Sequence, residues 1–127
     1  MVLLDTCALL WWTLDPNQLS TAAAEACTRM ATSGGLVSSI SIWEIGIKVK
    51  KKKLDLGIPV DDFVRLLKQT SVQIVPVDEV IWIENLRLPW DHSDPADRTI
   101  VATAQLRRIP IITSDRTIAA FYRDVIW

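Results

Sequence analysis

The sequence contains few of the residues that build zinc centres and disulfide frameworks. It has one histidine and only two cysteines, Cys7 and Cys27, which stand far apart in the chain. This set does not support a zinc site. Met1 leads straight into an apolar segment without a basic region, so we expect no signal peptide. Both cysteines are then expected to be free thiols in a reducing cytosol, and the protein to be cytoplasmic.

Long apolar runs and an excess of one charge are also missing. No stretch approaches the roughly 20 apolar residues that a membrane-spanning helix needs. The 14 basic and 15 acidic residues nearly cancel, so a nucleic acid would have to be met by a local basic patch. Half of the 127 residues are apolar and 23% are charged. This composition predicts one folded domain over residues 1–127 with a sizeable core.

Short apolar runs alternate with helical patterns along the chain. We expect strands over residues 2–5, 35–39, 72–77 and 110–113, and helices over 6–12, 19–32, 41–53, 59–70, 78–88, 95–108 and 115–122. The strands show no alternation of apolar and polar residues, which is typical of a parallel sheet covered on both faces. The expected fold class is therefore α/β, a three-layer α/β/α sandwich with a short parallel central sheet.

Four acids from separate stretches are expected at one edge of this sheet. Functional groups of an open parallel sheet gather at the carboxyl ends of the strands, where the helices begin. Asp5 follows the first predicted strand and Asp115 follows the last one. Glu44 and Asp97 are each expected in the first turn of a helix. The sequence thus predicts a cluster of acids at this edge, with more acids than the capping of helices requires.

Each acid by itself also fits a structural role. Ser41 and Glu44 have the spacing of a capping box, and Glu44 could pair with Lys48 one turn later. Asp94 is placed to cap the helix at 95, in which Asp97 is favoured by the helix dipole. The acids that follow strands could cap the helices after them.

Taken as a set, the acids favour a bound cation. Asp97 shares a helix face with Val101 and Ala104, so its carboxylate is expected at the edge of the buried side. Several acids held together repel one another and raise one another's pKa unless a cation neutralises them. Carboxylate oxygens without a cluster of Cys or His select Mg²⁺ or Mn²⁺. The set therefore predicts a divalent-metal site.

Four segments carry a resemblance to a known family. They are "LLDTCALLWW" at the N-terminus, "SSISIWEIGIK" at 38–48, "LPWDHSDPADRTIVATA" at 88–104 and "IITSD" at 111–115. In this order and spacing they resemble the PIN domain, and more narrowly the VapC-type toxins of bacterial toxin–antitoxin pairs. The resemblance implies a Mg²⁺-dependent endoribonuclease that acts on RNA and is inhibited by a cognate antitoxin, and it suggests a homodimer. The chain departs from the pattern at Ala96, where relatives often carry Phe, which concerns substrate preference.

The resemblance assigns the acidic site to positions that the sheet-edge argument also selects. They are Asp5, Glu44, Asp97 and Asp115. We expect Asp5 and Asp97 to bind Mg²⁺ (or Mn²⁺) directly, because they come from the strand end and helix start nearest the centre of the sheet. Glu44 and Asp115 would hold water or a second ion and orient the nucleophile. Three neighbours rank second: Thr6, Ser114 and Asp94.

Basic residues near these acids are candidates for contact with RNA phosphates. Arg98 and Arg116 each directly follow a site aspartate, which favours a phosphate contact. The run "KVKKKK" at 48–53 includes Lys50, Lys51 and Lys52. For this run, phosphate contact and a solvated helix end that complements the dipole both remain open. The single histidine, His92, fits a surface or capping position better than a general acid.

Six tryptophans are a large number for this length. Trp11 and Trp12 stand together, and Leu9, Leu10 and Leu14 lie beside them. Exposed aromatic residues grouped with leucine mark protein interfaces more often than base-stacking platforms. We therefore expect this segment to contact a partner protein, and the resemblance suggests the antitoxin or a second copy of the chain.

Two other functional classes share part of this pattern. A receiver-like phospho-acceptor domain also gathers acids around Mg²⁺, but it needs an acidic pair after the first strand, and Asp5 stands between Leu4 and Thr6. A catalytically silent PIN-fold interaction module is expected to have lost at least one site acid, whereas all of them are present. The ribonuclease interpretation is thus preferred.

Overall fold

The computed structural model describes all 127 residues, which form helices on both sides of one five-stranded sheet. The strands are β1 (Val2–Leu4), β2 (Gly35–Ser38), β3 (Val72–Val75), β4 (Ile111–Ile112) and β5 (Val125–Ile126). The helices are α1 (Thr6–Leu14), α2 (Thr21–Ser33), α3 (Ser39–Lys50), α4 (Val60–Leu67), α5 (Glu79–Arg87), α6 (Pro95–Arg107) and α7 (Arg116–Phe121), with a short 3₁₀ turn, η1 (Pro16–Gln18).

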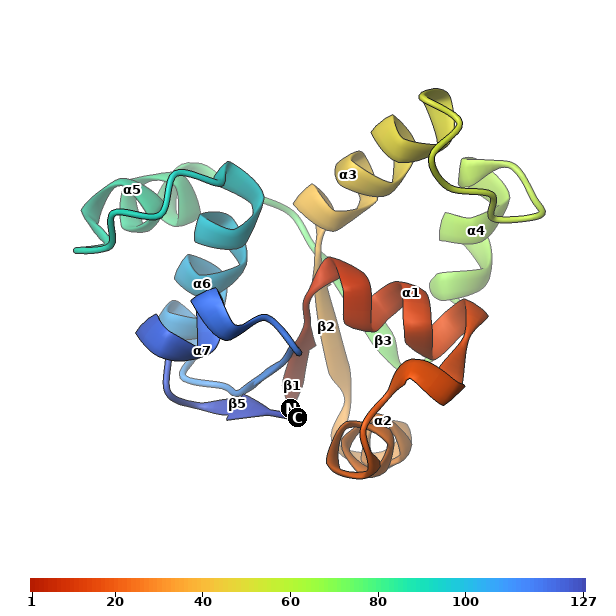
Figure 1. Cartoon of the computed structure of the whole chain (residues 1–127), viewed down its shortest axis with the longest axis horizontal. Coiled ribbons are helices and arrows are strands. Elements are labelled where there is room, and N and C mark those ends of the chain that lie inside the picture. The colour runs from red at the N-terminus through yellow and green to blue at the C-terminus, as the bar shows by residue number, and fades with distance from the viewer.

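All strand pairs are parallel, in the order β3-β2-β1-β4-β5. The central strand is β1, in which Leu3 lies in register with Leu36 on one side and Ile111 on the other. Figure 1 shows the sheet in the middle of the molecule, with α1, α2 and α4 on one side and α5, α6 and α7 on the other. The predicted α/β fold with a parallel central sheet is confirmed.

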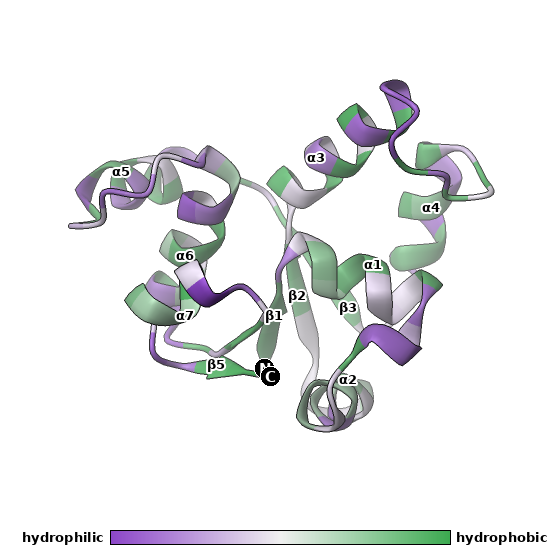
Figure 2. Cartoon of the chain, in the orientation of Figure 1, coloured by the Kyte–Doolittle hydropathy of each residue, from purple (hydrophilic) through white to green (hydrophobic).

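Each face of the sheet has its own hydrophobic core. Successive strand residues point to opposite faces, so Leu4, Val37 and Ile112 pack with α1 to α4, while their neighbours Leu3 and Leu36 pack with α5 to α7. A central strand buried in this way on both faces is hydrophobic throughout, as the colour of β1 in Figure 2 shows. This explains the absence of alternation in the sequence.

Two features of the fold differ from the sequence-based expectation. The last strand, β5, was not predicted, because its two residues become a strand only by pairing with β4. Helix α3 begins at Ser39, two positions before the predicted start, because the Ser38 side chain caps it and accepts a hydrogen bond from the Ile40 N–H at 3.2 Å. None of the helices has the length and apolar character needed to cross a bilayer.

Candidate active site

A small acidic cavity of about 150 Å³ lies where β1 and β4 end and where α1 and α7 begin. Figure 1 shows that the starts of α3 and α6 also lie at this edge of the sheet. The cavity brings together the four acids predicted as catalytic and two of the second-rank residues, Thr6 and Ser114, but not Asp94. It is lined by Asp5, Thr6, Cys7, Glu44, Lys48, Asp97, Ser114 and Asp115. Segments that are distant in the sequence therefore share one site.

Asp5 combines a structural role with a place in the site. Its Oδ1 accepts a hydrogen bond of 2.8 Å from the Ala8 N–H and so caps α1. Its Oδ2 accepts a hydrogen bond from the Thr113 hydroxyl. The side chain is only 6% exposed. Burial raises its pKa to about 6, and the charges of Asp97 and Asp115 add to this effect.

Glu44 is held in the cavity by the Thr6 hydroxyl and takes no part in a capping box. The Thr6 hydroxyl donates to Glu44 Oε1 at 2.5 Å, and Ser41 Oγ lies 2.9 Å from Thr6 Oγ1. Because α3 starts at Ser39, Glu44 lies in its second turn and Ser41 is buried. The capping-box prediction was therefore wrong. Burial raises the pKa of Glu44, and the hydrogen bond from Thr6 opposes that rise.

Asp97 occupies the third helical position of α6. Asp94 caps this helix as predicted, because its Oδ1 accepts a 2.9 Å hydrogen bond from the Asp97 N–H. The other contact is unexpected: His92 Nε2 lies 2.9 Å from Asp97 Oδ2. Burial raises the pKa of Asp97, the hydrogen bond to His92 opposes this rise, and the charges of Asp94 and Asp115 reinforce it. His92 is thus neither a cap nor a free surface residue.

Asp115 caps α7 with one oxygen and leaves the other free. Its Oδ1 accepts hydrogen bonds from the N–H groups of Thr117, at 2.7 Å, and Ile118, at 3.1 Å. Its own N–H donates to Thr113 Oγ1 at 3.0 Å. Thr113 therefore contacts two of the site acids, although the sequence did not single it out. Ser114 is exposed and lines the cavity.

The cavity is also lined by two residues that the sequence did not assign to the site, Lys48 and Cys7. Lys48 lies one turn after Glu44 on α3 and forms no ion pair, although the sequence spacing had suggested one with Glu44. Lys48 is the positively charged residue that lines the cavity, and its charge acts to lower the pKa of Glu44. Cys7 lies two positions after Asp5, and burial raises the pKa of its thiol. Cys7 lies in the first turn of the helix that directly follows Asp5, and this position in the sequence could have indicated that it lines the cavity.

The structure corrects the expectation that Arg98 contacts RNA. Its Nη1 donates to the backbone oxygens of Trp90, at 2.5 Å, and His92, at 3.0 Å. Its remaining N–H groups donate to the Asn85 side chain and to the backbone oxygens of Asn85 and Leu88. The guanidinium is therefore occupied within the protein. The other basic candidates are exposed, namely Arg116, Lys50, Lys51 and Lys52.

The donor set suits a hard divalent cation. No three Asp, Glu, His or Cys side chains lie close enough together to hold an ion by themselves. Mg²⁺, however, keeps several waters and commonly binds through one or two carboxylates. The acids that line the cavity have no cysteine or histidine cluster among them, and burial with mutual repulsion raises the pKa of Asp5 and Asp97. A bound cation would relieve that repulsion.

Comparison with known proteins agrees with this architecture. Residues 2–124 match the PIN domain family. The chain is 32% identical over 116 residues to Ribonuclease VapC22 of Mycobacterium tuberculosis, which covers 91% of this chain and 87% of that protein. Among solved structures, it is similar to a toxin–antitoxin complex from Klebsiella pneumoniae, with 22% identity and a TM-score of 0.69 over 100% of this chain and 97% of that one.

A second solved structure shows the same fold. VapBC2 from Rickettsia felis, bound to a DNA fragment from its promoter, has a TM-score of 0.72 with 12% identity over 100% of both chains. At these identities, the two structures support the fold alone. The family match over nearly the whole sequence and the relative at 32% identity carry more weight. On this evidence, the chain belongs to the PIN domain family.

Proposed function

We propose that residues 1–127 form a single PIN domain that acts as a Mg²⁺-dependent endoribonuclease, the toxin of a bacterial toxin–antitoxin pair. The observation that carries this proposal is the convergence of Asp5, Glu44, Asp97 and Asp115 on one cavity. The similarity to Ribonuclease VapC22 supports RNA as the substrate. Such an enzyme hydrolyses phosphodiester bonds of RNA in the cytoplasm and is inhibited by its cognate antitoxin.

Asp5 and Asp97 are the proposed ligands of the divalent cation. Asp5 is buried and Asp97 is half-buried, burial raises the pKa of both, and the charge of Asp97 adds to the rise at Asp5. Mg²⁺, or Mn²⁺ in its place, would lower the pKa of water and take up negative charge on the phosphate. The buried hydrogen bonds to Asp5 hold its carboxylate in place for this role.

Other side chains of the cavity accept the proton of the attacking water and contact the RNA phosphate. Glu44 Oε1 is held by Thr6, which leaves Oε2 to accept a proton from the attacking water. The free oxygen of Asp115 helps to orient that water. Lys48 places a positive charge beside these acids, where it can contact an RNA phosphate. Arg116 and the exposed lysines at the end of α3 would contact phosphates farther along the strand.

The central experiment measures RNA cleavage by the chain purified free of any partner. We expect cleavage of structured cellular RNA with Mg²⁺ or Mn²⁺, loss of cleavage in EDTA, and no cleavage by Asp5→Asn. The matched control is Asp61→Asn, which removes an exposed acid from α4, away from the cavity. Cleavage that persists in chelator or in Asp5→Asn contradicts the proposed mechanism.

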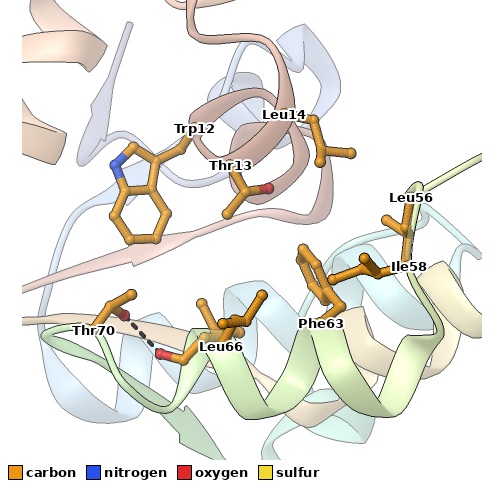
Figure 3. Close-up of a pocket in the computed structure, with 9 residues that line it drawn as sticks. Trp12, Thr13, Leu14, Leu56, Ile58, Phe63, Leu66 and Thr70 are labelled. Atoms are coloured by element: carbon orange, nitrogen blue, oxygen red, sulfur yellow. Dashed lines mark hydrogen bonds between the residues drawn. The ribbon is translucent and has the colours of Figure 1, made fainter.

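The proposed antitoxin surface is an apolar cavity of about 420 Å³ between α1 and α4. Figure 3 shows Trp12 and Leu14 of α1 on one side and Phe63 and Leu66 of α4 on the other. Leu14 and Leu66 are exposed, so this cavity opens apolar surface to a partner. An apolar segment of the antitoxin fits it better than a charged ligand.

The tryptophan segment contributes only in part to that surface. Leu9 is fully buried in the core, so it is not available to a partner, contrary to expectation. Trp11 packs against Trp127, with ring centroids 5.6 Å apart. Trp12 packs partly against the core and partly lines the cavity. The predicted contact surface is therefore narrower than the sequence suggested and is shared with α4.

The proposed homodimer uses a different face, formed by α3 and α5. Trp43 is 63% exposed and Leu86 is 81% exposed, and Trp82 and Ile83 are also exposed. A hollow of about 470 Å³ lies on the same face, between Trp43 and Trp82. A surface that has both protruding apolar side chains and a hollow can pair with a second copy of itself about a twofold axis.

Light scattering on the purified chain tests this dimer. The wild type is expected at twice the mass of 14.3 kDa. Trp43→Glu is expected to give a folded monomer, because it places a charge on the apolar face at the edge of the hollow. Leu106→Glu, an exposed apolar position on α6, serves as the control. A wild-type monomer at micromolar concentration contradicts the dimer.

A further inference from the structure

The loop between α5 and α6 is held in place by a residue of α6 itself. Arg98 donates hydrogen bonds to the backbone oxygens of Leu88, Trp90 and His92, at 3.4, 2.5 and 3.0 Å. It also binds Asn85 near the end of α5. Arg98 directly follows a site acid, so this loop is tied to the same helical turn that presents Asp97.

Aromatic packing then fixes the direction of the His92 ring. The ring centroids of His92 and Trp90 lie 4.8 Å apart, with an interplanar angle of 43°. Trp90 in turn stacks on Phe121 of α7, at 4.7 Å and 10°. The ring of His92 therefore rests on a stack that is anchored in another helix, and its Nε2 lies 2.9 Å from Asp97 Oδ2.

These contacts restrain a carboxylate that would otherwise rotate freely at the start of a helix. The Asp97 backbone is fixed by the cap from Asp94. The hydrogen bond to His92 occupies Oδ2, and no protein group donates to Oδ1, which stays available for a ligand in the cavity. His92 needs only to donate its Nε2–H to Asp97 for this purpose. This role differs from that of a general acid.

We propose that His92 is a positioning residue that orients Asp97 for the divalent cation, and that Arg98 and Trp90 hold His92 for this task. The proposal rests on the proposed function, because it assigns Asp97 to a metal site. Carboxylates and histidines that bind metals are commonly oriented by such outer partners, whose loss costs about 10–100-fold in metal affinity or activity. The structure places a complete set of these partners around one site acid.

Binding of Mn²⁺ alone, measured by calorimetry on the RNA-free chain, tests the proposal alongside RNA cleavage. His92→Ala is expected to weaken Mn²⁺ binding by about 10–100-fold and to slow cleavage to a similar extent. His92→Gln should recover most of both, because the glutamine amide nitrogen can take the place of Nε2–H as a donor. Ser93→Ala, in the same loop and exposed, is the control that should behave as wild type.

Arg98→Lys tests the support of His92 separately. A lysine keeps the charge but cannot bind several carbonyls at once, so Mn²⁺ binding should weaken much as in His92→Ala. Because both changes act through one hydrogen bond to Asp97, the double variant should bind Mn²⁺ no more weakly than the worse single variant. Additive losses in the double variant contradict the proposed chain of contacts.

Other outcomes separate this inference from the proposed function. If the wild type binds Mn²⁺ and cleaves RNA but His92→Ala does both equally well, the positioning role is refuted and the nuclease stands. If His92→Gln is as impaired as His92→Ala, the donated hydrogen bond is not what matters, and the proposal fails. If the wild type neither binds Mn²⁺ nor cleaves RNA, both proposals fall together.

Discussion

The hydroxyl of Thr113 donates a hydrogen bond to Oδ2 of Asp5, a residue 108 positions earlier in the chain. Thr113 directly follows β4 and Asp5 directly follows β1, and the two strands are neighbours in the sheet. The same threonine accepts a hydrogen bond from the N–H of Asp115 at 3.0 Å. One buried hydroxyl therefore ties together two acids of the site. Burial raises the pKa of Asp5, and the hydrogen bond from Thr113 opposes that rise.

Stability of the metal-free protein should increase as the pH falls from 7.5 to 5. Burial raises the pKa of Asp5 from 3.8 to about 6, so the folded state binds this proton more tightly than the unfolded state does. The stabilisation is fully present below about pH 4 and is lost as the pH rises through 6. From Asp5 alone we expect about 1 kcal/mol more stability at pH 5, and Glu44 and Asp97 shift in the same direction.

Urea unfolding in EDTA at a series of pH values measures this effect. The chelator matters because a bound cation would keep the carboxylates charged. A free energy of unfolding that stays level or falls between pH 7.5 and pH 5 would mean that Asp5 is not a buried acid with a raised pKa.

Asp5→Asn should raise the melting temperature at pH 7.5 and flatten its pH dependence. The substitution removes a buried charge and its repulsion with Asp97 and Asp115, and its oxygen can still accept from the Ala8 N–H. Thermal unfolding followed by circular dichroism, in EDTA at pH 5 and pH 7.5, compares the variant with the wild type. A variant that melts well below the wild type at pH 7.5 would show that the charge of Asp5 stabilises the fold.

The three aspartates of the segment before α6 should behave differently. Asp97→Asn is expected to abolish cleavage with little loss of stability, because Asp97 lines the cavity. Asp94→Ala should cost about 0.5–2 kcal/mol, as expected for a lost cap, and keep part of the activity. Asp91→Ala should change little, because Asp91 is exposed and lies outside the helix.

RNA cleavage and urea unfolding on the same preparations decide these assignments. Asp94→Asn is the control, since asparagine caps a helix about as well as aspartate. Loss of cleavage in Asp94→Asn, with cleavage retained in Asp97→Asn, would move the metal role from Asp97 to Asp94.

Trp12→Glu and Leu66→Glu should each weaken binding of the cognate antitoxin at least tenfold. Both residues line the apolar cavity between α1 and α4, from opposite sides (Figure 3), and neither is wholly buried. A buried charge without a partner in that interface is costly. The affinity is measured by titration of the antitoxin into each folded variant.

Leu106→Glu introduces the same charge at an exposed position that lies outside this cavity. It should bind the antitoxin as the wild type does. Antitoxin binding that survives Leu66→Glu unchanged would place the partner elsewhere. Leu66 decides this point better than Trp12, because Leu66 is about half exposed whereas Trp12 also packs against the core.

The sequence by itself determined the fold class and which acids meet at one edge of the sheet. Local patterns carry this information: apolar runs without alternation predict strands buried on both faces, and the acids that follow them mark the edge where parallel strands end. Asp94 was likewise predicted as a cap, and the structure has it in that role. These features depend on residues near one another in the chain, so their spacing is enough to predict them.

Only the tertiary structure decided which distant side chains meet at that edge. Thr113 donates a hydrogen bond to Asp5. His92 contacts Asp97 and packs on Trp90, which stacks on Phe121 of α7. Arg98 donates hydrogen bonds to backbone carbonyls within the protein. A sequence pattern predicts which face of an element is buried, but it does not predict which polar groups lie opposite across a packed interface. The partners of buried polar groups are set by the packing of the whole chain, because each one must be satisfied where it comes to rest.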